Sequence, residues 1–371
     1  MRKELSFIFF LLMLSQAYAQ KTYPSNTWAQ IPIDCKIGYV SPAGKLMIPG
    51  QFEHASGFSE GLAFVWTYAN HRDAEKTTSL GEEYKYYDIV SNSITGIIDS
   101  TGTYIVQPKL NFQMVRPFQD GIAYVRIDNE VRIINKKGEL IPFTDPRYDK
   151  QYKQILRVAK NKETGKPSFA NAYSTSVYQG FDGCEEFSGN FAAIKMAGKA
   201  GYINRAGELT IVPQFQEGGP FKEGYATVAT SYPDNENRER KFYGLIDTLG
   251  NYVISPKYSF LGEVSEGLIS FTTSDRKMGY LNIAGDTVVA PLYTRAYSFS
   301  EGLAHVEING KSGYINKKGA MVIAAAYEWC RPFKAGVALV TTDKHIALIN
   351  TSGNIIYGPV KMEDCDKRNC K

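Results

Sequence analysis

The sequence predicts an all-β protein, built as a tandem array of about eight three-stranded antiparallel units. Three observations lead to this fold class. One glycine-centred pattern recurs along most of the chain, and its plainest copy runs from Gly279 to Val306. Short runs of β-forming residues are separated by tight-turn signals such as Asn-Gly. No window has a sustained helical period, so we expect little helix.

The pattern begins with Gly, two apolar residues, Asn or Asp, and a second Gly. An apolar run follows and in most copies ends in Pro, and then come a Phe, an acid-Gly pair and Leu-Ala-x-Val. Its last three steps are 35, 34 and 34 residues, and longer steps upstream indicate insertions at 66–95, 145–180 and 231–241. A fixed period of this kind is typical of repeat architectures. The second glycine of each copy is Gly44, Gly102, Gly138, Gly207, Gly250, Gly285, Gly319 or Gly353.

Each strand of a unit has a local reason. The runs 303–306 and 313–316 are rich in β-formers, and Asn309-Gly310 lies between them. Both turn residues accept positive φ, so the two runs should pair as a hairpin. The run 320–323 should add a third strand after the turn at Gly319. Proline ends the equivalent run in most copies, because it cannot donate a ladder hydrogen bond.

Two sets of motif residues should be structural. One aromatic residue per unit should stack along the array and bury a continuous apolar layer. The glycine of each acid-Gly pair should provide the positive φ of a tight turn. The aromatic positions include Phe58, Phe118, Phe221, Phe299 and Phe333, and the glycines include Gly61, Gly121, Gly224, Gly267 and Gly302.

The array is expected to form an open, solenoid-like superhelix, with a closed β-propeller as the alternative. No Leu-Ala-x-Val run precedes the first unit at Gly38, and the period of about 34 residues is short for a four-stranded blade. In an open array, residues 20–37 and the tail at 360–371 would cap the exposed ends. The repeats themselves occupy 38–359.

These motifs resemble the bacterial WG-repeat family, also called the KWG-repeat family. The resemblance rests on the glycine-centred run and on Phe-x-acid-Gly-Leu/Tyr-Ala-x-Val. It covers most of the chain from Gly38 to Pro359. The tryptophan that names the family is missing, because no copy has Trp before its first Gly. The family implies the repeat fold and no general biochemical function.

The first 19 residues are typical of a secretory signal peptide. Arg2 and Lys3 precede a Phe- and Leu-rich run, and Ala17-Tyr18-Ala19 fits a cleavage site before Gln20. We therefore expect export to the periplasm, the cell surface or the medium, with no transmembrane segment after cleavage. The net charge is +4, from 42 Lys and Arg against 38 Asp and Glu, and this balance does not favour nucleic acid. The five cysteines match no zinc motif.

No pattern predicts catalytic residues, a metal site or a cofactor. Gly57–Gly61 matches Gly-x-Ser-x-Gly, but the repeat itself generates the match, without the required strand-to-helix turn. The acids of the acid-Gly pairs provide one carboxylate per unit, too few for a closed cation site. We expect them to fix their loops by accepting backbone N–H bonds.

Function is expected in the insertions, because loops that break a repeat period often form the binding face. The predicted function is a non-catalytic binding scaffold for a protein or a glycan. The alternative is a carbohydrate-active enzyme with acids from different repeats. The segment 145–180 is a degenerate repeat, an exposed basic arm or disordered. The candidate binding residues are Trp66, Tyr68, Tyr84, Tyr86, Tyr87, Lys150, Lys153 and Arg157.

Overall fold

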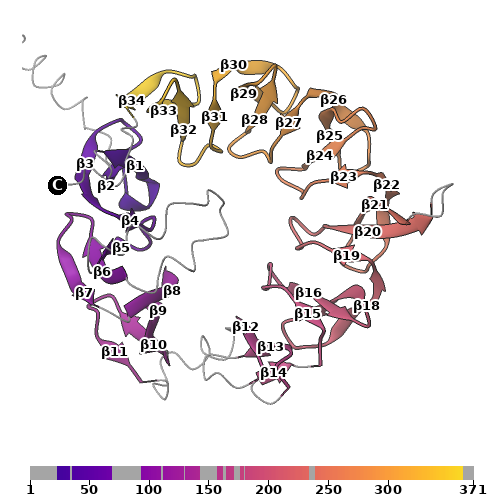
Figure 1. Cartoon of the computed structure of the whole chain (residues 1–371), viewed down its shortest axis with the longest axis horizontal. Helices are drawn as coiled ribbons and strands as arrows, with labels where there is room; N and C mark the ends of the chain where they lie inside the picture. The colour runs from indigo at the N-terminus through magenta and orange to yellow at the C-terminus, as the bar shows by residue number, and fades with distance from the viewer. Residues whose placement is uncertain are drawn as a thin grey trace, which may run out of the picture.

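The computed structural model describes ten segments of the chain. These are residues 23–33, 36–68, 93–109, 112–128, 130–142, 157–161, 164–170, 176–178, 180–233 and 239–361. Within them the chain forms nine antiparallel sheets that follow one another around a ring (Figure 1). We number these sheets as units 1 to 9 in chain order. The all-β prediction is confirmed, and the described residues contain only one short 3-10 turn, Ser25–Thr27.

The first five units comprise eighteen strands. Units 1 and 4 have three strands, and the others have four. The strands are β1 (Ala29–Ile33), β2 (Lys36–Val40) and β3 (Leu46–Phe52); β4 (His54–Ala55), β5 (Leu62–Tyr68), β6 (Ser93–Asp99) and β7 (Tyr104–Lys109); β8 (Phe112–Gln119), β9 (Ile122–Ile127), β10 (Glu130–Asn135) and β11 (Leu140–Ile141); β12 (Arg157–Lys160), β13 (Pro167–Ala170) and β14 (Ser176–Tyr178); and β15 (Gly183–Cys184), β16 (Phe191–Met196), β17 (Lys199–Asn204) and β18 (Leu209–Phe215).

Units 6 to 9 are the most regular, with four strands each. Their strands are β19 (Glu217–Gly218), β20 (Ala226–Pro233), β21 (Glu239–Ile246) and β22 (Tyr252–Tyr258); β23 (Phe260–Leu261), β24 (Leu268–Thr272), β25 (Met278–Asn282) and β26 (Thr287–Tyr293); β27 (Arg295–Ala296), β28 (Leu303–Ile308), β29 (Lys311–Asn316) and β30 (Met321–Tyr327); and β31 (Trp329–Cys330), β32 (Val337–Thr342), β33 (His345–Asn350) and β34 (Ile355–Lys361).

The regular unit has one more strand than the sequence predicts. A two-residue strand, such as β27, pairs with the start of the predicted meander and lies on its inner side (Figure 1). The acid-Gly turn then leads into the second strand. The predicted hairpin is confirmed, with Leu303 opposite Asn316 and Val306 opposite Gly313.

The first glycine of the motif is required by the close approach of the outer strand. A Cβ added at Gly313 would lie 2.6 Å from the carbonyl oxygen of Ile323, and one at Gly201 would lie 2.5 Å from that of Ile211. At the same place the pairing of β29 with β30 shifts register between Ser312 and Tyr314. Glycine therefore lets the outer strand bulge against the third strand.

Two segments belong to sheets that the sequence analysis did not assign. Ala29–Ile33, expected within a terminal cap, pairs along its length with β2 and is the second-strand equivalent of unit 1. Within 145–180, strands β12, β13 and β14 form an antiparallel sheet. The described part of this segment thus forms a three-stranded sheet of its own. Phe169 from β13 is fully buried and packs on Phe181 and Phe187 at the start of unit 5.

The core lies between successive units. Phe64, Trp66 and Ile97 of unit 2 pack against Phe112 and Phe118 of unit 3. At the two ends of the array, Ile31 and Val40 of unit 1 pack against Ile346 and Leu348 of unit 9. Among the described strands, none is shared between these two sheets. The ends therefore meet through side chains, as the closed alternative requires, while the strand pairing stays within each unit.

Candidate functional site

The acid-Gly loops connect each unit to the next through their serines. Four serine hydroxyls donate to the carbonyl of the phenylalanine in the following unit. The pairs are Ser59 to Phe118 at 2.5 Å, Ser188 to Phe221 at 2.7 Å, Ser265 to Phe299 at 2.6 Å, and Ser300 to Phe333 at 2.6 Å. The sequence offers no local signal for these bonds, because donor and acceptor lie 33 to 59 residues apart.

The acids of the same loops make a second connection between units. The Glu301 carboxylate accepts the N–H groups of Ala335 and Gly336 at 2.6 and 2.7 Å. Glu223 accepts from Glu266 and Gly267 at 2.6 and 3.0 Å. The repeated acids therefore do bind backbone N–H groups, as expected, but the loop that they fix is that of the following unit.

The carboxylate of Glu266 shows the electrostatic setting of these loops. It accepts from the Gly302 N–H and lies 2.9 Å from the Lys317 ammonium. Partial burial opposes its ionisation, but the hydrogen bonds from Lys317 and Gly302 outweigh burial and lower the pKa of this carboxyl. The acid stays ionised and engaged, which suits a structural role.

Buried tyrosines make the third connection. Their hydroxyls donate to a carbonyl in the next unit, and their rings contact the motif phenylalanine there, with centroids 4.7 to 4.9 Å apart. The hydrogen-bonded pairs are Tyr39 with Ser56, Tyr202 with Gly219, Tyr280 with Tyr297, and Tyr314 with Arg331, at 2.6 to 2.8 Å. We call the serine, acid and tyrosine connections the three clasps.

Units 8 and 9 are joined by all three clasps, whereas the junction of unit 9 with unit 1 has different residues at all three positions. Leu348 replaces the tyrosine, Lys334 replaces the serine and Ala335 replaces the acid. Leu348 and Ala335 cannot make the corresponding bonds, and among the described residues the Lys334 side chain makes no hydrogen bond to unit 1. We call this junction the seam. It is held by the apolar contacts of Ile31, Val40, Ile346 and Leu348.

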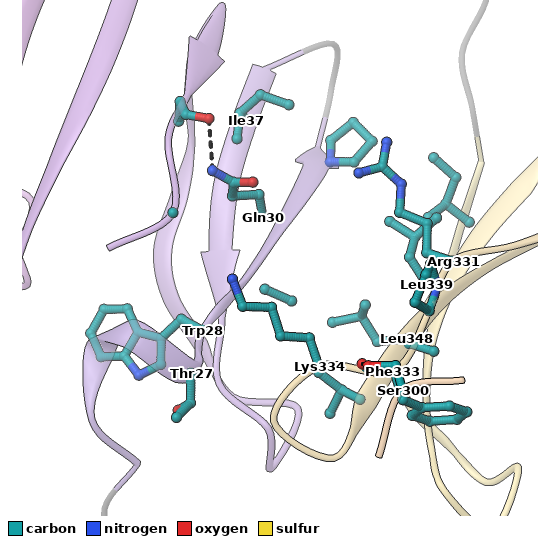
Figure 2. A pocket seen from close by; sticks show the side chains of 18 of the residues that line it. Thr27, Trp28, Gln30, Ile37, Ser300, Arg331, Phe333, Lys334, Leu339 and Leu348 are labelled. Carbon is teal, nitrogen blue, oxygen red and sulfur yellow. Dashed lines mark hydrogen bonds between the residues drawn. The ribbon is translucent and has the colours of Figure 1, made fainter. Parts of the chain in front are cut away.

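A cavity of about 780 Å³ opens at the seam (Figure 2). One wall comes from β1 and β2 and the other from unit 9, so the site combines the two ends of the array. Its size is within the range of small-ligand sites. Apolar lining is provided by Ile37, Leu339 and Leu348, and polar lining by Thr27 and Gln30. We call this site the seam cavity.

Two cationic side chains, Arg331 and Lys334, extend from unit 9 towards unit 1 (Figure 2). Within the described part of the chain, no carboxylate forms an ion pair with either of them. The Arg331 guanidinium lies 5.2 Å from the ring centroid of Trp329, an indole that also lines the cavity and is 43% exposed. A cation over an aromatic face is held in place without losing its charge.

Among the other titratable groups of the lining, only the Glu301 carboxylate offsets part of this positive charge. Glu301 lines the cavity, but its carboxylate already accepts two backbone N–H groups. Burial lowers the pKa of His54, against the opposing effect of Glu53, so this ring is neutral at neutral pH. The formal charge of the lining is therefore +1, from Arg331 and Lys334 against Glu301.

The predicted binding residues that the structure describes do not line the seam cavity. Trp66 lies in β5, is 6% exposed and packs in the core between units 2 and 3, so its ring is not presented on a loop. Tyr68 ends β5, and Arg157 begins β12. The remaining candidates, Tyr84, Tyr86, Tyr87, Lys150 and Lys153, lie outside the described residues.

Sequence reasoning missed the seam cavity, although one signal was present. The acid-Gly pair is Ala335-Gly336 in the last full copy, and this departure marks the junction where the acid clasp is absent. Among the predicted structural residues, Phe58, Phe118, Phe221, Phe299 and Phe333 are buried, and Gly61, Gly121, Gly224, Gly267 and Gly302 have positive φ. Cys330 is buried, Cys184 is half-buried, and both are free.

The described residues contain no group of three or more His, Cys, Asp or Glu side chains placed to hold a metal ion. None of their helices is long and apolar enough to cross a membrane.

One known protein family matches the sequence of this chain. The family described as "WG containing repeat" matches residues 37–65, 96–130, 201–230, 243–273, 278–311 and 313–344, which together make up more than half of the chain. The protein therefore belongs to the WG containing repeat family. Each matched segment begins in one unit and ends in the following unit, and the matches leave out β12 to β14. No curated protein matches the chain.

Several solved structures are similar at low identity. Apo AztD from Citrobacter koseri is 13% identical, with 73% of this chain and 80% of that chain covered and a TM-score of 0.35. BamB from Moraxella catarrhalis is 11% identical, with 88% and 94% covered and a TM-score of 0.33. The WD40 β-propeller domain of Doa1 is 10% identical, with 65% and 81% covered and a TM-score of 0.29. These values are too low to transfer any function.

Proposed function

We propose that this protein is an exported, non-catalytic binding scaffold that holds a protein or glycan ligand at the seam cavity. The observation that carries the proposal is the pair of cations, Arg331 and Lys334, in a cavity at the one junction where all three clasp positions of a regular unit are replaced. Between units 8 and 9, by contrast, the same three positions join the units.

The repeated acids are poor candidates for catalysis. A glycosidase needs two carboxyl groups that face the scissile bond. The carboxylates of Glu60, Glu223, Glu266 and Glu301 accept backbone N–H groups of the next unit instead. An acid that is needed to hold a loop cannot easily exchange protons with a substrate.

A retention experiment on envelope material tests the proposal. The mature protein, from Gln20, is immobilised and presented with envelope polysaccharides and envelope proteins. It is compared with a variant carrying Arg331→Gln and Lys334→Ser, and with one in which residues 70–91 are replaced by a short Gly-Ser turn. These bounds spare Trp66 and Thr95, which are buried in strands β5 and β6.

We expect wild type to retain a ligand whose mass is unaltered. The variant carrying Arg331→Gln and Lys334→Ser should not retain this ligand. Retention that is lost only on shortening the 70–91 segment would move recognition to that insertion. A ligand recovered in cleaved form, or no ligand at all, would contradict a binding scaffold. Export is checked separately, by sequencing the N-terminus of the protein from the periplasm and medium, where Gln20 should come first.

A further inference from the structure

The charge of the seam cavity selects the kind of ligand. Its lining carries a formal +1, so a ligand with a single negative charge balances it. A phosphate dianion would leave one charge uncompensated in a partly enclosed site, at an energetic cost. A carboxylate has one charge and two acceptor oxygens, which suit the ammonium of Lys334.

The neighbours of the two cations select what the carboxylate is attached to. Trp329 presents an exposed indole beside Arg331, and the C–H face of a sugar ring packs well on such a surface. Thr27 and Gln30 supply short neutral groups at the opposite wall. The Gln30 side-chain N–H donates to the Ala55 carbonyl at 2.7 Å, which leaves its oxygen as an acceptor for a hydroxyl (Figure 2).

We propose that the seam cavity binds a uronic acid residue of an acidic glycan, with Lys334 on the carboxylate, Trp329 against the sugar ring and Gln30 on a hydroxyl. This inference rests on the proposed function, because it names the ligand class of the same site. The cavity offers several neutral hydrogen-bonding groups and balances a single negative charge. This lining suits a hydroxyl-rich sugar ring with one carboxylate better than the side chains of an acidic peptide.

Lys334→Ser is the informative substitution, because serine is the residue that other units have at this position. Ser59, Ser188, Ser265 and Ser300 all occupy it without disturbing the fold. Lys222 provides a matched control, since it occupies the same position in unit 6 and does not line the cavity. Lys222→Ser removes an equal charge from an equivalent loop far from the seam.

The test is calorimetric titration of the mature protein with tetragalacturonate, its methyl ester and an Asp-rich tetrapeptide. Wild type should bind tetragalacturonate, and more weakly as salt rises. Lys334→Ser should lower the affinity about 10- to 150-fold, because one charge-assisted contact is lost. Lys222→Ser should leave the affinity for tetragalacturonate within about twofold of the wild-type value. Wild type should bind the methyl ester no more tightly than Lys334→Ser binds tetragalacturonate.

Three results would overturn the inference: equal binding of the methyl ester, an unchanged affinity in Lys334→Ser, or stronger binding of the peptide than of the glycan. Thermal unfolding of each variant is compared with that of wild type, so that a loss of affinity is distinguished from a loss of folded protein. If envelope material is retained while tetragalacturonate is not bound, only the ligand class is wrong. If neither is bound, the proposed function fails with it.

Discussion

The tyrosine clasps permit a clean test of how successive units are joined. Tyr314 is fully buried, and its hydroxyl donates to the Arg331 carbonyl at 2.7 Å. Tyr314→Phe keeps the ring on Phe333 and removes this bond, together with the contact between the hydroxyl and the Cys330 thiol. A net hydrogen bond contributes about 0.5–1.5 kcal/mol, and an unsatisfied carbonyl costs about 1–3 kcal/mol. We therefore expect a loss of about 1–2 kcal/mol in the free energy of unfolding.

The assay is urea unfolding followed by circular dichroism, with the m-value compared between variants to confirm that the unfolding transition is unchanged. Tyr232→Phe is the control, because Tyr232 is 50% exposed and its substitution should cost less than about 0.5 kcal/mol. Adding Tyr202→Phe should double the loss, since that residue joins units 5 and 6. A Tyr314→Phe protein as stable as Tyr232→Phe would refute the role of this clasp.

Three further predictions concern the motif and its exceptions. Gly313→Ala should cost about 1–3 kcal/mol in thermal unfolding, because its Cβ would crowd the Ile323 carbonyl, and full stability would contradict this account. Glu301→Ala should speed hydrogen exchange at the amides of Ala335 and Gly336 relative to wild type and leave exchange at Gly267 unchanged. Wild-type exchange rates at Ala335 and Gly336 in this variant would argue against the acid clasp. His305→Phe should remove an acid-sensitive part of stability. Burial lowers the pKa of His305 from 6.5 to about 4, so the unfolded chain takes up a proton first as pH falls. Wild type should lose about 3 kcal/mol between pH 6.5 and 4 at this site, and a variant with the same pH dependence would refute it.

The sequence predicted the repeat and its turns because their causes are local. Gly285 and Asn309-Gly310 set turns within a few residues, and Leu303–Val306 pairs with the strand that follows it. The inner strand was missed because Arg295–Ala296 is too short to have a recognisable period. β1 was missed because Ala29–Ile33 lacks the Leu-Ala-x-Val pattern, although its pairing is complete.

The site could not be predicted because it depends on contacts between distant parts of the chain. The N–H groups that donate to Glu301 lie 34 and 35 residues away, in another unit, and no local pattern identifies them. The seam cavity requires residues from both ends of the array, such as Gln30 and Lys334, to lie opposite each other. Only the loss of the acid at Ala335 marked the place in advance.

The contact between the two end units can be broken selectively at Gly44. A Cβ at this glycine would overlap the backbone carbonyl of Ile356 in the outer strand of unit 9, whereas a Cβ at Gly285 would lie 3.5 Å from Ile254. Gly44 and Gly285 occupy equivalent turn positions in units 1 and 7, with φ of 80° and 90°. Substitution by alanine therefore introduces a similar backbone strain at each. Only Gly44→Ala acts on the seam.

Small-angle X-ray scattering of wild type, Gly44→Ala and Gly285→Ala therefore tests the seam most directly. We expect wild type and Gly285→Ala to have the same maximum dimension, and Gly44→Ala to be longer, because its end units separate. Gly44→Ala should also lose the ligand that the seam cavity binds. A wild-type profile already as long as that of Gly44→Ala, or three identical profiles with undiminished binding, would contradict a ligand site formed where the chain ends meet.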